Sequence, residues 1–297
     1  MASLVRTLPR AHSASSRRLL CQSHRISPVL AFSSNWNHVQ KRTQATVAES
    51  GPAVTATNRA EATLKRFWKT VGIEKRDNGH LVTLDKRPLK TPSGKHLLLP
   101  KEKRLAAILV AGEWDNQDTL LKQHSLPMTS LTSRAIDALG DEETRKQVRA
   151  QLLKYLETDT ICFHQTEPQT IVDLQAQHWN PLLDWVQSEF SVQISTSNSF
   201  FRPVHPEETF KKFDEVMQKF DPWEMAAMER AVYTSKSFII ALALIKRQIT
   251  AEQAAQASHV EVNSQIEKWG EVEDSHDVDY HDVRRQLASA AVLSSNL

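Results

Sequence analysis

Glycine is scarce in this chain, and its few positions exclude several classes of nucleotide-binding protein. The 297 residues hold only seven glycines. Phosphate-binding and dinucleotide-binding loops need glycines at fixed spacings, where the backbone must approach the phosphates closely. None of the seven has such a spacing, and the Gly-Lys pair at Gly94 lacks the earlier glycine of a phosphate loop, because position 89 is leucine. We therefore expect neither nucleotide hydrolysis nor a bound cofactor.

Acidic residues are absent from one end of the chain. Residues 1–48 contain no Asp or Glu, but they contain seven Lys or Arg residues and eight serines. A basic, serine-rich, acid-free start is typical of a transit peptide for an organelle. The remaining chain has 30 basic and 35 acidic residues, a net charge of −5. That balance argues against a nucleic-acid partner, which would require clustered Lys and Arg.

Cysteine is almost missing too, with Cys21 and Cys162 as the only two. Cys21 lies in the predicted transit peptide, so the mature chain would keep a single thiol. One cysteine allows neither an internal disulfide nor a cysteine-based zinc site. The neighbours of Cys162, "TDTICFH", are half apolar, which favours a buried structural thiol over a nucleophile.

Long hydrophobic runs are also missing. The longest is "FIIALALI", residues 238–245, and eight residues rise only about 12 Å as a helix, far less than a bilayer core. We expect no membrane insertion. The hydrophobic content of 40% and charged content of 24% are ordinary for a soluble globular protein.

The pattern after the first 48 residues changes twice. Residues 49–63 are small and polar and indicate a linker. Residues 64–140 predict a small α+β domain, with three or four short antiparallel strands between positions 66 and 99 and a hairpin at "RDNG". An amphipathic helix follows, with Leu105, Ile108, Leu109 and Trp114 expected to face the sheet.

Residues 141–297 predict a mainly helical domain. Asp141, Asp221 and Thr250 are expected to cap helices, the last two in capping boxes. The expected helices are 141–156, 170–189 with an adjustment at Pro181, one from Pro206, 222–245, one from 251 that Gly270 ends, and a last one from the acidic stretch onward. The helix 222–245 is apolar on nearly every side and should lie at the centre of a bundle. The fold class is therefore α+β.

The stretch "EVEDSHDVDYHD", residues 271–282, carries eight acidic or histidine side chains in twelve positions. A calcium loop would need a glycine at its sharp turn, and His276 and His281 lie about 140° apart on a helix. We expect no metal site. Acids at the start and Arg284 and Arg285 near the end match a helix dipole, so a solvated helix explains most of this charge.

Four residues stand out as candidates for partner binding. Trp269 lies between an apolar stripe (Ala251, Ala255, Val262, Ile266 and Trp269) and the acidic stretch, a composition found at interfaces and equally compatible with core. Glu261 lies about 100° from this stripe. Glu229 is an isolated acid on an apolar helix, where it either meets a partner or pairs with Arg230 or Lys236. With Glu273, these residues are hypothesised to border one surface.

Several stretches in order resemble one protein family. They are "RFWKTVGIE", "LDKRPLKTPSGKHLLLP", "EWDNQ", "MTSLTSRAID", "YLETDTICF", "WNPLLDW", "MERAVYTSKSFIIALAL" and "QIEKWGEVEDSHDVDYHD". The resemblance, from about residue 64 to 290, is to the mitochondrial assembly chaperones of the F-type ATP synthase that act on the α subunit of its catalytic head. Lys86 departs from the glycine usual there, which puts only the local turn in question.

The resemblance implies a protein of the mitochondrial matrix. Because no phosphate loop or catalytic motif is present, we expect it not to be an enzyme, and we expect a monomer. The resemblance also implies binding of the unassembled α subunit and shielding of its interface until the β subunit replaces the chaperone. Two alternatives remain: a helical matrix enzyme that uses residues 271–282, and an accessory subunit of the mature complex.

Overall fold

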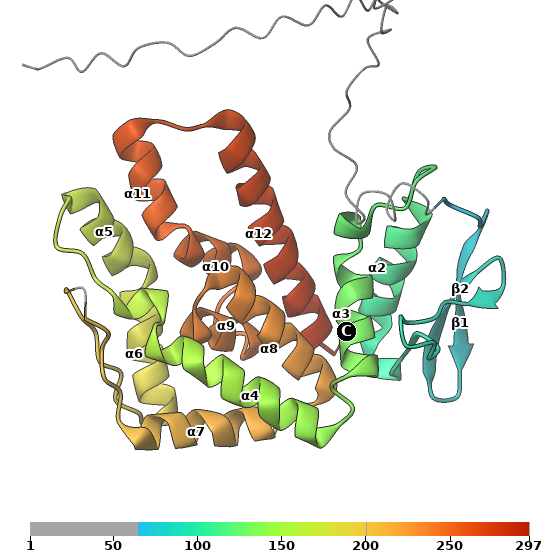
Figure 1. Ribbon diagram of the computed structural model, residues 1–297, viewed down its shortest axis with the longest axis horizontal. Helices are drawn as coiled ribbons and strands as arrows, with labels where there is room; N and C mark the ends of the chain where they lie inside the picture. Colours follow the sequence, from blue (N-terminus) through green and yellow to red (C-terminus); the bar gives the residue numbers. More distant parts are fainter. Residues whose placement is uncertain (1–64, 200, 297) are drawn as a thin grey trace, which may run out of the picture. The chain divides into compact units, whose positions relative to one another are not determined.

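The computed structural model describes residues 65–199 and 201–296 (Figure 1). The predicted transit peptide, residues 1–48, and the predicted linker, residues 49–63, lie outside these ranges. The described chain begins with a small antiparallel sheet and continues almost entirely as helices. The α+β fold class is therefore confirmed.

The sheet is built around one hairpin. Strands β1 (Val71–Arg76) and β2 (Gly79–Leu84) pair in register from Val71 with Leu84 to Arg76 with Gly79. Two short strands, β3 (Arg87–Pro88) and β4 (Leu98–Leu99), both pair with β2. Gly79 has a φ of +151°, and a Cβ there would lie 1.9 Å from the carbonyl oxygen of Leu99. The predicted hairpin and its glycine therefore have a steric reason.

Helix α2 (Arg104–Asp115) covers the sheet with small residues, and its predicted orientation is correct for Trp114, which packs against the core, but wrong for two aliphatic residues. After the 3₁₀ turn η1 (Lys101–Lys103), it buries Ala106, Ala107 and Val110. Ile108 and Leu109, expected to face the sheet, are 44% and 38% exposed. Small side chains let the helix axis approach the strands closely, which turns the larger aliphatic residues outward.

The motif "EWDNQ" joins α2 to α3 (Pro127–Asp137). The carboxylate of Glu113 accepts hydrogen bonds from the backbone N–H groups of Met128 (2.6 Å) and Thr129 (2.8 Å), which caps the start of α3. Burial raises the pKa of this carboxyl. The Trp114 indole donates to the Thr129 hydroxyl at 3.0 Å, and its ring packs 4.9 Å from that of Trp68. This part of the family motif is therefore structural.

Two longer contacts hold the sheet region against distant parts of the chain. Asp137 accepts from the Thr91 hydroxyl (2.7 Å) and the Ser93 backbone N–H (3.1 Å) in the loop between β3 and β4. Lys103, only 3% exposed, donates its ammonium to the carbonyl of Ser295 at 2.9 Å. Burial lowers the pKa of Lys103.

The rest of the described chain is a helical bundle. Its members are α4 (Glu142–Glu157), α5 (Gln169–His178), α6 (Asn180–Phe190), α7 (Glu207–Gln218), α8 (Pro222–Ser235), α9 (Phe238–Ile245), α10 (Ala251–Ser258), α11 (Val260–Trp269) and α12 (Glu273–Ser294). Every residue of α9 is buried, and α8 packs against α3, α4, α9 and α12. The expected central position of this apolar segment is confirmed. The expected caps at Asp141, Asp221 and Thr250 are also present.

Three segments expected as single helices are each split into two. The breaks fall at Trp179, Lys236 and His259. At the second break Lys236 adopts a left-handed conformation with φ of 57°, and the Ser237 hydroxyl accepts from the Ile240 N–H at 3.0 Å to start α9. Local capping therefore overrides the continuous apolar pattern that predicted one helix.

Candidate functional site

An exposed apolar and acidic surface lies where α11 connects to α12, at the upper edge of Figure 1. Its apolar side chains are Trp269, Val272 and Val278, which are 71%, 61% and 69% exposed. The Lys268 ammonium lies 4.9 Å above the Trp269 ring. The interpretation of Trp269 as core is therefore wrong. We call Glu261, Trp269, Val272, Glu273 and Val278 the α11–α12 surface.

The break at His259 explains why the expected stripe does not stay buried. Helix α11 buries only Val260 and Ser264, a pair spaced by one turn. The stripe predicted through Val262, Ile266 and Trp269 assumed a continuous helix from residue 251. Because the chain turns at His259, the helical phase is reset and Trp269 points to solvent.

The first part of the acidic stretch forms no ion pairs within the described chain, whereas Asp279 and Asp282 in its second part pair with basic side chains. Within residues 65–199 and 201–296, no ion pair involves Glu271, Glu273, Asp274 or Asp277, all exposed. Further along, the Asp279 carboxylate lies 3.1 Å from the buried His259 ring, and Asp282 pairs with Arg285. Burial is the main cause that lowers the pKa of His259. The expected acids lie in the first turn of α12, but the expected basic end was wrong: the helix continues to Ser294, so Arg284 and Arg285 lie near its middle and its last turn holds no basic residue.

The described residues contain no cluster of His, Cys, Asp or Glu suited to a metal ion. The same part of the chain has no helix long and apolar enough to span a bilayer. Cys162 is fully buried, and burial raises the pKa of its thiol far above the ordinary value. The prediction of a structural thiol is confirmed.

Glu261 is exposed in the first turn of α11. It lines a pocket of about 660 Å³ with residues 163–167, Asn198 and Ser199. Trp269 follows eight residues later on the same helix, roughly 12 Å along the axis, and Glu273 follows across the short connection. These three residues therefore lie along one continuous stretch of α11 and the start of α12.

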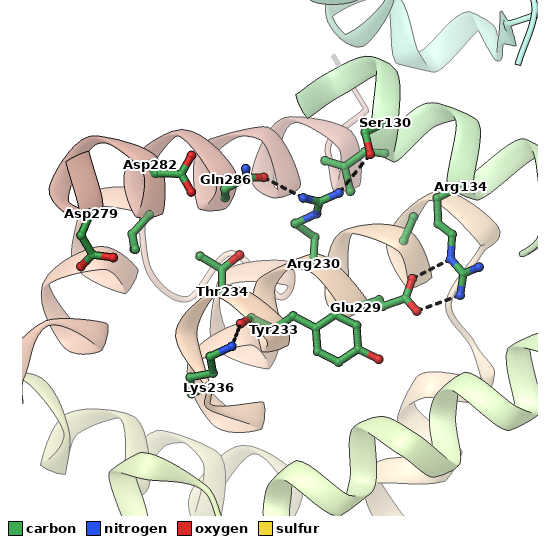
Figure 2. A pocket seen from close by; sticks show the side chains of 13 residues that line it. Ser130, Arg134, Glu229, Arg230, Tyr233, Thr234, Lys236, Asp279, Asp282 and Gln286 are labelled. Atoms are coloured by element: carbon green, nitrogen blue, oxygen red, sulfur yellow. Dashed lines mark hydrogen bonds and ion pairs between the residues drawn. The ribbon is translucent and has the colours of Figure 1, made fainter. Parts of the chain in front are cut away.

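Glu229 lies in a different pocket, shown in Figure 2. It is buried on α8, and both of its carboxylate oxygens accept from the Arg134 guanidinium of α3, each at 2.9 Å. Hydrogen bonding to Glu229 raises the pKa of Arg134. The expectation of an internal ion pair is confirmed, but the expected partners, Arg230 and Lys236, were wrong.

Arg230 and Lys236, the two expected partners, form hydrogen bonds with other groups (Figure 2). The Arg230 guanidinium donates to Gln286 of α12 at 3.0 Å and to the Ser130 hydroxyl of α3 at 3.2 Å. The Lys236 ammonium donates to the carbonyl of Tyr233 at 2.6 Å. The pocket of about 600 Å³ therefore has a floor on α8 and walls from α3 and α12.

The four candidate residues are thus not all brought together. The Glu229 pocket and the Glu261 pocket share no lining residue. Helix α12 connects the two regions, because it begins at Glu273 and lines the Glu229 pocket with Asp279 and Asp282. Sequence reasoning missed Val272 and Val278, whose signal is an isolated aliphatic residue between acids on both sides.

Comparisons with known proteins agree with the sequence motifs. Residues 65–187 match a family model described as the ATP12 chaperone protein. The mitochondrial protein atp12 of Schizosaccharomyces pombe is 35% identical, over 79% of this chain and 83% of its own length. The mitochondrial protein ATP12 of Saccharomyces cerevisiae is 30% identical, over 80% and 86%.

Solved structures show the same fold. The crystal structure of Atp12 from Paracoccus denitrificans superposes with a TM-score of 0.67 at 28% identity, and covers 79% of this chain and 98% of that one. A structure from Agrobacterium tumefaciens gives a TM-score of 0.68 at 28% identity, over 77% and 84%. Because two relatives are at least 30% identical to this chain over more than four fifths of their own length, the chain belongs to the ATP12 chaperone family.

Proposed function

We propose that the chain is an assembly chaperone for the catalytic head of the mitochondrial ATP synthase, acting in the matrix on the unassembled α subunit. Family membership supports the chaperone role. An unassembled subunit exposes an apolar interface, and such patches aggregate. The chaperone covers this interface until the β subunit replaces it.

The α11–α12 surface is the proposed client-binding site, and the exposure of Trp269 is the observation that carries it. A tryptophan that is 71% exposed gains little from the fold, whereas buried tryptophans are among the strongest contributors to protein interfaces. Exposed carboxylates at Glu261 and Glu273 would form the polar rim. Glu229 lies in a separate pocket that α12 also lines, so it would take part only if the client extends along α12.

Release without nucleotide limits how tight this contact can be. The glycine positions leave no phosphate loop, so binding and release would follow equilibrium competition rather than an ATP cycle. The chaperone must then bind the α subunit more weakly than the β subunit does. A surface that mixes a few apolar side chains with unpaired acids fits that requirement better than a large apolar face.

Charge reversal at Glu261 tests the site. Glu261→Lys should weaken protection of purified α subunit against aggregation while changing the free energy of unfolding by no more than about 0.5 kcal/mol, because the residue is exposed. Glu143→Lys, at an exposed acid on α4, is the matched control. If Glu261→Lys is stable and still protects fully, the site lies elsewhere. Early unfolding would instead make Glu261 structural.

Pulldown from matrix extract tests the function itself. Recovery of free α subunit without β subunit is expected. Recovery of the complete synthase would favour the accessory-subunit alternative, and turnover of a small-molecule substrate lost on Asp277→Asn would favour the enzyme.

The targeting proposal is separate from both experiments. A reporter fused to residues 1–60 should enter mitochondria and become shorter there. A full-length reporter in the cytosol would overturn it.

A further inference from the structure

The sheet and α2 leave a further cleft, far along the chain from the α11–α12 surface. It has a volume of about 580 Å³ and is lined by Ile73, Lys75, His80, Lys101, Arg104 and Ile108. These six residues come from β1, β2, η1 and α2.

The strand register explains where the cleft lies. Ile73 pairs with Val82, and Lys75 pairs with His80, so these four side chains share one face of the hairpin. Val82 is fully buried on this face. Toward the β1–β2 turn the buried layer ends, and the same face continues as Ile73, Lys75 and His80 beside the start of α2.

The cleft is positively charged and lacks compensation. Lys75, Lys101 and Arg104 line it, no lining residue is acidic, and none of these three cations pairs with a carboxylate of the described chain. The first turn of α2 also carries no acid, although a helix start favours negative charge. Glu102 directly follows Lys101 in sequence but does not line the cleft.

His80 and two aliphatic side chains, Ile73 and Ile108, form the rest of the cleft. Ile73 is 37% and Ile108 is 44% exposed, and Leu109 beside Ile108 is 38% exposed. Ile108 and Leu109 are residues that an ordinary amphipathic helix would bury, but α2 buries Ala106, Ala107 and Val110 instead. The site therefore combines an apolar wall with three cations that pair with no carboxylate of residues 65–199 and 201–296.

We propose that this cleft is a second interaction surface, which binds an acidic protein segment that carries an apolar side chain. The three cations match carboxylates of the segment, and the space between Ile73 and Ile108 accepts one apolar side chain. Its concave shape favours a protruding side chain over a flat membrane surface. The proposal is independent of the client-binding site, because the two share no residue.

Fluorescence anisotropy with a labelled decapeptide tests the proposal on the full mature chain. The probe alternates Asp or Glu with Leu or Phe, and a second probe has Lys in place of every acid. The acidic probe should bind, more weakly as ionic strength rises, and the basic probe should not. Lys101→Glu with Arg104→Glu should reduce the affinity at least about tenfold, because two attractive contacts become repulsive.

The matched control reverses two exposed lysines of α4, Lys146 and Lys154, which likewise pair with no carboxylate of the described chain. This double variant should bind the acidic probe within about twofold of the parent chain. Ile108→Ser should weaken binding several-fold and identify the apolar wall. If the cleft and control double variants bind equally, or if both probes bind alike, the proposal is wrong.

Two further measurements distinguish loss of binding from loss of folding, and a protein partner from a membrane. If the charge-reversed cleft variant melts early, Lys101→Gln with Arg104→Gln replaces it, and unchanged affinity in that variant overturns the proposal. Cosedimentation with phosphatidylcholine vesicles, with and without cardiolipin, tests the alternative that the cleft binds a membrane surface. Vesicle binding that requires Lys101 and Arg104, without binding of the acidic probe, would also overturn it.

Discussion

Helices α9 and α11 have similar lengths but opposite surroundings. All eight residues of α9 are buried, whereas α11 buries only two of its ten. The apolar side chains of α9 contact neighbours on every side, and the largest apolar side chain of α11, Trp269, faces solvent. Substitutions in α9 should therefore mainly lower the free energy of unfolding, whereas substitutions in α11 should mainly weaken client binding.

The strongest way to test this contrast is a cavity in α9. Phe238 is fully buried, and its ring lies 5.1 Å from that of Phe213. Phe238→Ala should lower the free energy of unfolding by about 3–5 kcal/mol, since it removes buried surface and leaves a void. Val278→Ala, at a 69% exposed position, should change it by no more than about 0.5 kcal/mol. Urea unfolding of both variants is the measurement, and similar losses would contradict the contrast.

Unfolding measured at a series of pH values tests the contribution of Asp159, a buried carboxylate that binds the start of α9. The Asp159 carboxylate accepts from the N–H groups of Ile239 (3.0 Å) and Ile161 (3.2 Å), and complete burial raises its pKa to about 6. Because the folded pKa is above the unfolded value, the contribution of this group to stability is complete at low pH and is lost as pH rises through about 6.

Asp159→Asn removes this dependence. The stability of the parent chain relative to the variant should fall by on the order of 2 kcal/mol between pH 4.5 and 7.5. Denaturant unfolding at several pH values measures the difference, in which groups shared by both proteins cancel. A difference that is independent of pH would show that Asp159 keeps an ordinary pKa in the fold.

The pair between α3 and α8 should have a smaller effect. Arg134→Ala leaves the Glu229 side chain, 11% exposed, without its guanidinium. We expect a loss of about 1–2 kcal/mol, above that of an exposed pair and below that of a fully buried one, because the Arg134 side chain is 42% exposed. Replacing both residues by Met should be milder than Arg134→Ala alone.

Lys211→Ala supplies the control for this pair, since it breaks an exposed pair with Glu207. Its effect on thermal unfolding should be less than about 1 kcal/mol. If Arg134→Ala is no worse than this control, Glu229 does not depend on its partner within the chain, and its role in client binding gains weight.

The smallest effect on the free energy of unfolding is expected at Trp269, the exposed residue at the end of α11. Trp269→Ala should change the free energy of unfolding by no more than about 0.5 kcal/mol. If Trp269 is buried by the client, the same change should weaken the complex by about 2 kcal/mol or more. Titration of α subunit against parent and variant measures the second quantity. Unaltered affinity would remove Trp269 from the proposed site.

Sequence reasoning succeeded where a signal was local and failed where two signals competed. The caps at Asp221 and Thr250 were predictable because the capping residues and their partners lie three positions apart. The break at Lys236 was not, because Ser237 caps a new helix inside an unbroken apolar run. The break at His259 was missed in the same way, and the prediction therefore placed Trp269 on a buried stripe.

The candidate site was less predictable than the fold. An acid on an apolar helix correctly indicated a paired carboxylate at Glu229, but its partner, Arg134, is 95 residues away. No local pattern specifies such a contact. The outward orientation of Ile108 likewise depends on how closely α2 approaches the sheet, which periodicity alone does not contain.

The contact between Lys103 and the Ser295 carbonyl has a consequence for the order in which the chain can mature. These residues are 192 positions apart, so during synthesis the sheet region emerges well before the carbonyl that its buried ammonium binds. Burial of an ammonium without an acceptor is costly, so the region around Lys103 can pack fully only after Ser295 has been made. Packing of the sheet region is therefore coupled to the segment that follows α12.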